Sequence, residues 1–278
     1  KQLNLISILM DIDRAIASSL DLKVIGSIFT EKAIKHLQTD AIDILLYNQY
    51  AQKFSFMYGS GFLKQKEKQL ILNSSTDLCG KMLLKNEPVF ISNLRDEGII
   101  CTRSQLAQEE GFVSYYGIPI TAKGRLIGVV EIFFRRQFKP DSAWFNFAKS
   151  FSLQLAIAVD NALLYEKSQH TQSELLQAYN NTIEGWSYAL DLRDNETEGH
   201  SRRVTRMTVQ IAQRVGMGEE EIAHVYRGAL LHDIGKLGIP DNILLKPSPL
   251  TEEEWVIMRK HPVYAYEMLS SIAYLKQA

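Results

Sequence analysis

Cysteine is scarce in this sequence of 278 residues, and its net charge is close to zero. The two cysteines, Cys79 and Cys101, do not have CxxC spacing, so we expect neither a disulfide framework nor a thiolate zinc site. With 31 basic and 32 acidic residues the formal net charge is −1, and neither half carries a stripe rich in lysine or arginine. A nucleic-acid polymer is therefore not an expected partner.

Long apolar runs are also missing. No run approaches 18 apolar residues and the first residues lack a signal-peptide pattern, so we expect a cytoplasmic protein with no membrane segment in this chain. An apolar fraction of 46% and a charged fraction of 23% are typical of an ordinary protein of about two domains. The sequence starts at Lys1 without a methionine and stops in an apparent helix, so we interpret it as an excerpt of a longer polypeptide.

Changes of hydrophobic period predict a mixed α+β domain over residues 1–165. The expected elements are helices at 1–18 and after a cap at Asp21, strands at 41–47 and 54–59, a helix near 78–84, a short strand at 88–91, and strands at 111–121 and 125–135. The last two strands form the clearest hairpin, turning at Ala122–Gly124. Its second strand is apolar enough to be a central strand.

Two segments within this region carry a family resemblance. S-Y-Y-G-I-P-I at Ser114–Ile120 and R-L-I-G-V-V-E-I at Arg125–Ile132 resemble the pattern of a GAF domain, a small-molecule sensing module. The resemblance covers roughly residues 1–165 and implies an antiparallel sheet flanked by helices. GAF domains bind very different ligands and many bind none, so the ligand is an unknown small molecule. Cys79 and Cys101 are either ligand contacts or packed or solvated thiols.

A long helix is expected after this domain, over residues 141–190. Apolar side chains recur every three or four residues from Trp144, and Gly185 is the single glycine between Asp141 and Glu198, a stretch without proline. Such a segment is typical of a parallel two-helix coupler in a homodimer. A helix that packs on its own domain is the alternative. Dimerisation is favoured because the apolar seam narrows to alanine and leucine beyond His170.

The residues most suggestive of chemistry are His232 and Asp233. They follow the apolar run 222–231, which predicts a buried helix, and Lys236 comes three residues later. An imidazole, a carboxylate and an ammonium group in this order indicate a metal and phosphate site. By itself the dipeptide is better explained as an ordinary helix end, and the residues on both sides of it change that balance.

Further possible ligands lie on both sides of this dipeptide. Glu196 and His200 are four residues apart, which places them on one helix face if the helix holds through Gly199. A carboxylate and an imidazole suit a first-row divalent metal, although an exposed pair without metal is the alternative. Downstream, Thr251 begins a helix that we expect to reach His261. The following proline is expected to end or kink it.

Three segments of this second region together carry a specific resemblance. G-H-S-x-R-V at Gly199–Val204, H-D-I-G-K-L-G-I-P-D-N-I-L-x-K-P at His232–Pro247 and L-T-x-E-E-W-x-x-M-R-x-H-P at Leu250–Pro262 resemble the first half of an HD-GYP domain. That family belongs to the HD metal-dependent phosphohydrolases and hydrolyses cyclic di-GMP. The resemblance implies an all-α domain over residues 191–278.

The resemblance also implies a role for each residue. His200, His232, Asp233 and His261 would be metal ligands, with Asp233 bridging two ions, and Glu196 would complete a third metal site. Lys236 would contact or protonate phosphate. The implied cofactors are two or three iron or manganese ions, and the implied reaction is attack of hydroxide on phosphorus.

The sequence ends before the later paired histidines, the last aspartate and the Gly-Tyr-Pro motif of that family. We therefore expect a partial metal site. The phosphodiesterase activity is assigned to the parent protein in preference to this chain, which can be inactive. The alternatives are an HD phosphohydrolase acting on another nucleotide and a non-catalytic dimeric sensor or regulator. A further hypothesis is that a ligand in 1–165 moves the helix 141–190 and re-aims Glu196 and His200 at the metals.

Overall fold

The computed structural model describes residues 19–63, 72–73, 80, 84–95, 103–194 and 199–278. The chain divides into two compact units, Lys1–Gln169 and His170–Ala278. Helix α5, Ser142–Arg193, has its first part in one unit and its second part in the other. Each unit is described by itself.

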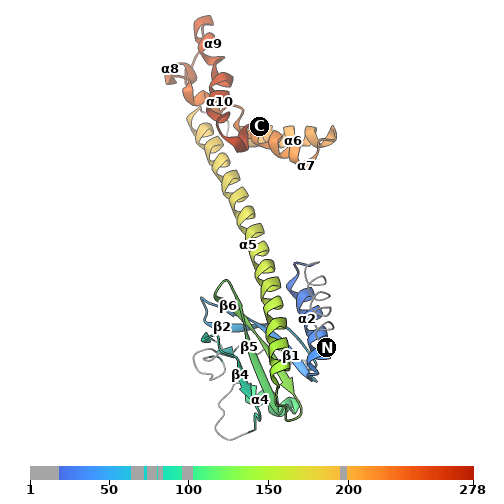
Figure 1. Cartoon of the computed structure of the whole chain (residues 1–278). Helices are drawn as coiled ribbons and strands as arrows, with labels where there is room; N and C mark the ends of the chain where they lie inside the picture. The colour runs from blue at the N-terminus through green and yellow to red at the C-terminus, as the bar shows by residue number, and fades with distance from the viewer. Residues whose placement is uncertain (1–18, 64–71, 74–79, 81–83, 96–102, 195–198) are drawn as a thin grey trace. The chain divides into compact units, whose positions relative to one another are not determined.

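The first unit is built on a six-stranded sheet whose neighbouring strands are antiparallel (Figure 1). Its strands are β1 Ala41–Asn48, β2 Lys53–Ser60, β3 Leu72–Asn73, β4 Val89–Ile91, β5 Ser114–Ala122 and β6 Arg125–Phe134. Their order across the sheet is β3-β2-β1-β6-β5-β4. The strand β6 therefore pairs on both sides, which confirms that the most apolar predicted strand is a central one.

The hairpin β5–β6 forms at the predicted place. Ala122 pairs with Arg125, which leaves Lys123 and Gly124 as a two-residue loop with φ values of 50° and 75°. Two consecutive positive φ values characterise a type I′ turn, whose twist matches that of the strands. Glycine adopts this conformation without a steric penalty, so the Lys-Gly dipeptide directs the chain back at this point.

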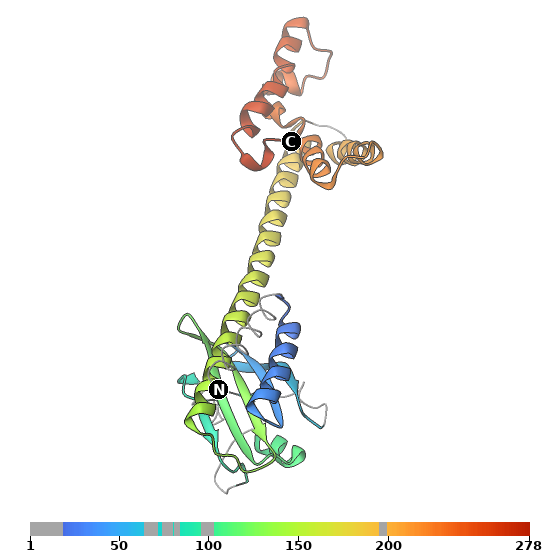
Figure 2. The same ribbon diagram turned by 45° about the vertical axis from the view of Figure 1, so that its right-hand side comes forward.

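Helices cover both faces of the sheet. On one face α2, Leu22–Leu37, packs beside the first part of α5 (Figure 2). The rings of Phe29 and Phe151 have centroids 4.2 Å apart. Helix α2 begins after Asp21, whose carboxylate accepts the predicted capping hydrogen bond from the Lys23 amide. On the other face α4, Arg103–Glu110, covers a second apolar cluster that includes Phe112 and Phe133. The expected α+β fold is confirmed.

Some expectations fall outside the described residues. They concern the helix at 1–18, most of the helix near 78–84, and the two cysteines, Cys79 and Cys101. These stay predictions. In the part of the chain that the structure describes, no helix combines the length and the apolar content that a bilayer crossing requires.

The second unit is helical wherever it has regular structure among its described residues. The second part of α5 is followed by α6 His200–Arg214, α7 Glu219–Leu231, the 3-10 helix η2 Ile234–Gly238, α8 Asp241–Leu244, α9 Glu252–Met258, α10 His261–Leu269 and the 3-10 helix η3 Ala273–Leu275. A buried cluster joins Ile183 of α5 to Leu230 and Leu231 of α7 and to Ile234 of η2. This core places the end of α7 inside the unit, which is where the His-Asp dipeptide lies.

Candidate metal centre

Helix α7 presents His232 and Asp233 at its C-terminus. The helix starts after Gly218 and has three glutamates in its first turn. Their negative charges interact favourably with the positive N-terminal end of the helix dipole and stabilise the helix. Leu230 and Leu231 are buried, and His232 is the C-terminal cap. The His232 Nδ1 atom lies 2.9 Å from the carbonyl oxygen of Ala229, one turn earlier.

His261 occupies an equivalent local setting, but not the one predicted. Helix α9 ends at Met258, and His261 is the first residue of α10 rather than the last of α9. The helix opened at Thr251 does stop before Pro262, but the proline itself lies in the first turn of α10, where no amide donor is needed. The Nδ1 atom of His261 lies 2.8 Å from the Met258 carbonyl oxygen.

These two contacts fix the tautomer of both imidazoles. A carbonyl oxygen only accepts hydrogen bonds, so Nδ1 of each ring carries the hydrogen and Nε2 of the neutral ring carries a lone pair. Nε2 of His232 lies 3.2 Å from Asp233 Oδ2, and Nε2 of His261 lies 3.5 Å from Asp233 Oδ1. Lone pairs facing a carboxylate at these distances require a proton or a metal cation between them. The donor set therefore fits a divalent metal.

His200 approaches the same place from α6. One ligand atom each from His200, His232 and Asp233 lie within 4.8 Å of one another. The condition for placing Glu196 and His200 on one helix face, a helix that holds through Gly199, is not met: Gly199 has φ 76°, a left-handed conformation, and α6 begins at His200. Glu196, the remaining predicted ligand, lies outside the described residues.

Lys236 lies between two carboxylates. Its Nζ atom is 2.7 Å from Asp233 Oδ2 and 3.0 Å from Asp194 Oδ2, and 14% of its side chain is exposed. Burial of the Asp233 carboxyl acts to raise its pKa. When the His232 ring is protonated on both nitrogens, its hydrogen bond to Asp233 and the one from Lys236 outweigh burial and hold the pKa below the usual range. Asp233 is therefore ionised, as a metal ligand must be.

Two glycines bring η2 and α10 into close contact next to the candidate ligands. A Cβ atom added to Gly235 would lie 1.8 Å from the backbone oxygen of His261 and 2.6 Å from the backbone nitrogen of Ala265. One added to Gly238 would lie 2.8 Å from the ring of Tyr264. Backbone contact at Gly235 therefore sets the approach of His261 toward Asp233.

Sequence reasoning missed two residues that support this region. Arg193, the last residue of α5, donates hydrogen bonds to the carbonyls of Leu237 and Ile239 at 2.7 and 3.0 Å and to Asp241 at 2.9 Å. The Asp194 carboxylate accepts a hydrogen bond from the Lys236 ammonium group at 3.0 Å. These contacts join residues more than 40 positions apart. No local spacing in the sequence signals them.

Comparison with protein families places both parts of the chain. A model described as "GAF domain" matches residues 21–159, half of the chain, and a model described as "HD domain" matches residues 197–277. The GAF match covers the sheet and the helices that pack on it. The HD match covers the candidate ligands His200, His232, Asp233 and His261.

Curated relatives are similar to part of the chain. A "Cyclic di-GMP phosphodiesterase response regulator RpfG" of Xanthomonas campestris pv. campestris is 34% identical over 117 residues, which cover 42% of this chain and 30% of the relative. A "Cyclic di-GMP phosphodiesterase" of Thermotoga maritima is 46% identical over 80 residues, 29% of this chain and 22% of the relative. A "3'3'-cGAMP-specific phosphodiesterase 2" of Vibrio cholerae is 34% identical over 116 residues, 42% of this chain and 21% of the relative. The chain thus spans between about a fifth and a third of the length of these relatives.

Solved structures resemble the sheet-containing unit. The GAF domain of a phosphoenolpyruvate-protein phosphotransferase from Coxiella burnetii superposes with a TM-score of 0.53 at 19% identity, covering 59% of this chain and 98% of that domain. At this level of identity the likeness shows a shared fold.

Proposed function

Because this chain belongs to the GAF domain family and carries an HD domain, we propose that it is a signalling protein whose HD part hydrolyses cyclic di-GMP in a metal-dependent reaction. One observation carries the proposal: His232 and His261 are both anchored through Nδ1 and both direct Nε2 at Asp233. Relatives named as phosphodiesterases of cyclic dinucleotides support the substrate class. The proposed domain limits are 1–165 for the sensor, 141–190 for the connecting helix and 191–278 for the hydrolase part.

The metal ligands in this proposal are His200, His232, Asp233 and His261, with Glu196 as a further ligand. Two or three iron or manganese ions are the proposed cofactors, because mixed imidazole and carboxylate ligation suits these metals. A bound divalent metal would supply a hydroxide-like nucleophile near neutral pH and polarise the phosphoryl oxygens.

The chain's own residues orient the substrate phosphate. Asp194 and Asp233 hold the Lys236 ammonium group beside the candidate ligands, so that its charge lies next to a phosphate bound there. This ammonium group would offset negative charge as it develops on the phosphoryl oxygens. Arg193 supports the same step indirectly, because its hydrogen bonds fix the backbone that follows Lys236.

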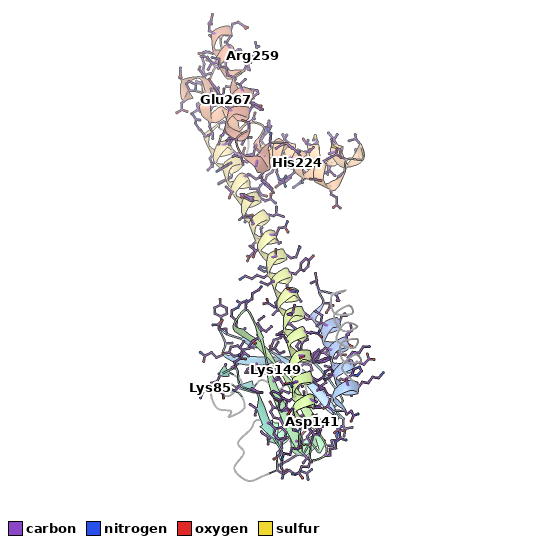
Figure 3. The ribbon with its side chains drawn as sticks, viewed as in Figure 1. Lys85, Asp141, Lys149, His224, Arg259 and Glu267 are labelled. Atoms are coloured by element: carbon purple, nitrogen blue, oxygen red, sulfur yellow. The ribbon has the colours of Figure 1, made fainter. Side chains whose placement is uncertain are left out.

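Hydrolysis by this chain tests the proposal directly. Cyclic di-GMP and 3′3′-cGAMP are incubated with the chain and added Mn²⁺ or Fe²⁺, and linear and mononucleotide products are separated by chromatography. We expect cyclic di-GMP turnover that His232→Ala lowers by about 100-fold, because a ligand is lost. His224→Ala is the matched control, since His224 lies on the same helix and contacts Arg227 rather than the candidate ligands (Figure 3). It should keep the rate within about twofold.

Two outcomes favour the competing functions. Metal binding without turnover of either dinucleotide, by this chain and by its parent protein alike, favours a non-catalytic sensor or regulator. Turnover of a nucleoside monophosphate or triphosphate in place of both dinucleotides favours a different HD phosphohydrolase. In the same assay, a rate that does not change when a ligand saturates the GAF domain contradicts regulation by that domain, since regulation requires differential affinity for two states.

The proposed assembly is a parallel homodimer formed through α5. Leu153, Ile157 and Leu164 have exposed fractions of 57%, 56% and 41%, and their spacing of four and seven residues places them on one side of the helix. Ile157→Glu should therefore convert a dimer to a monomer, measured by light scattering coupled to size exclusion. Leu63→Glu, which changes an equally apolar exposed residue outside the helix, is the control and should leave the mass unchanged. A dimer that survives Ile157→Glu would place the interface elsewhere.

A further inference from the structure

A pocket of about 330 Å³ lies in the GAF unit beside α5. Tyr116 and Ile118 of β5 form one wall, and Phe145, Lys149 and Leu153 of α5 form the other, with Pro88 ahead of β4 at one end. Tyr116 and Ile118 belong to the apolar cluster that packs against α2 and α5. The pocket is therefore on the face of the sheet that α5 covers, not on the face beneath α4.

Tyr116, one of the residues that line this pocket, carries an unsatisfied polar group. The residue is 3% exposed, and its hydroxyl is buried with no hydrogen-bond partner among the described residues. Edge-on contacts to Trp144 and Phe145, with ring centroids 5.2 and 5.9 Å away, fix the orientation of the ring. Burial raises the pKa of Tyr116 to about 12, so the hydroxyl stays protonated and can donate. A buried donor without an acceptor costs free energy, which an acceptor on a ligand would recover.

Lys149 adds a positive charge at the rim of the pocket. It is exposed on α5 beside the sheet (Figure 3), and it forms no ion pair with any residue that the structure describes. Exposed side chains such as Lys149 change rotamer on the nanosecond timescale, so the rim can admit a small molecule on this side. The remaining walls are largely apolar, formed by Pro88, Ile118 and Phe145.

We propose that this pocket binds a small aromatic carboxylate. The flat ring would lie against Ile118 and Phe145, and the carboxylate would accept a hydrogen bond from Tyr116 and face Lys149. Small-molecule sites of this kind combine apolar walls with a few placed polar groups. The binding proposal is independent of hydrolysis by the HD part. A ligand in this pocket would contact α5, the helix that we propose connects the GAF unit to the HD part.

Binding of 2-naphthoate, measured by isothermal titration calorimetry, tests the proposal on the whole chain. We expect Tyr116→Phe to weaken binding about fivefold and Lys149→Gln to weaken it about threefold, as for the loss of one hydrogen bond or one exposed charge contact. The uncharged 2-naphthamide should bind less tightly than 2-naphthoate. Tyr116→Phe should also raise the melting temperature of the free chain by about 2 °C, because an unpaired buried hydroxyl is removed.

Tyr115→Phe is the matched control. The Tyr115 hydroxyl donates to buried Glu131 at 2.7 Å, so its loss should lower the melting temperature while the affinity for 2-naphthoate stays the same. The proposal is overturned if 2-naphthoate does not bind at millimolar concentration, or if Tyr116→Phe binds it as tightly as the unmodified chain. Equal affinity for 2-naphthamide would overturn the carboxylate class.

Discussion

Asp233→Asn should lower the affinity of this chain for Mn²⁺ by at least about 100-fold, with the helical content unchanged. Asp233 is the residue that His232, His261 and Lys236 all approach, and each of its oxygens faces one imidazole. Asparagine keeps the shape but replaces one oxygen with a hydrogen-bond donor and removes the negative charge. Titration with Mn²⁺ followed by electron paramagnetic resonance of the free ion measures the change, and circular dichroism checks the fold.

Asp141→Asn is the matched control for this variant. It makes the same chemical change at the start of α5, where the Asp141 carboxylate accepts a hydrogen bond from the Trp144 amide. Asparagine caps helices about as well as aspartate, so both metal affinity and stability should be unchanged. If Asp233→Asn retained the affinity of the unmodified chain, the metal would be bound elsewhere and the proposed ligand set would be wrong.

Gly235→Ala should lower the free energy of unfolding by about 3 kcal/mol or more. The added methyl group would meet backbone atoms of His261 and Ala265, which cannot rotate away as a side chain can. The same substitution should also weaken metal binding, because a displaced His261 loses its position beside Asp233. Urea denaturation followed by circular dichroism measures the stability, and the Mn²⁺ titration measures the site.

Gly185→Ala should raise the stability of the chain, whereas Gly235→Ala should lower it. Gly185 lies in the interior of α5 at an exposed position, with no described atom within 4 Å of an added Cβ. Alanine should therefore stabilise the helix by about 1 kcal/mol through propensity. Equal effects of the two substitutions would show that the contact between η2 and α10 is looser than the structure has it.

The sequence predicts the elements whose signals are local. The hairpin followed from two apolar runs separated by a lysine-glycine turn, and the start of α9 from the capping residues Thr251 and Glu254, which form the expected reciprocal hydrogen bonds. The His232-Asp233 dipeptide was found because it follows a continuous apolar helix. Each of these signals lies within about ten residues, so no knowledge of tertiary contacts was needed.

The sequence-based predictions failed for two reasons: one residue type can fit two local structures, and some partners are distant in the sequence. Gly199 is tolerated inside a helix, but its left-handed φ lets the chain turn just before His200. Pro262 ends a helix as readily as it begins one, and the packing of α10 on η2 decides between them. Arg193 and Asp194 were missed because their partners lie across the fold. The role of Glu196 stays a prediction.

The spacing of Gly235 and Gly238 follows from the number of residues per turn in the helix that contains them. A 3-10 helix has three residues per turn, so positions three apart lie directly above one another on the same side. Both glycines therefore present bare backbone to α10, one against His261 and the other against the ring of Tyr264. An ordinary α-helical turn here would rotate Gly238 about 60° away from that line. The motif between Asp233 and Pro240 thus encodes a helix with three residues per turn as well as a set of chemical groups.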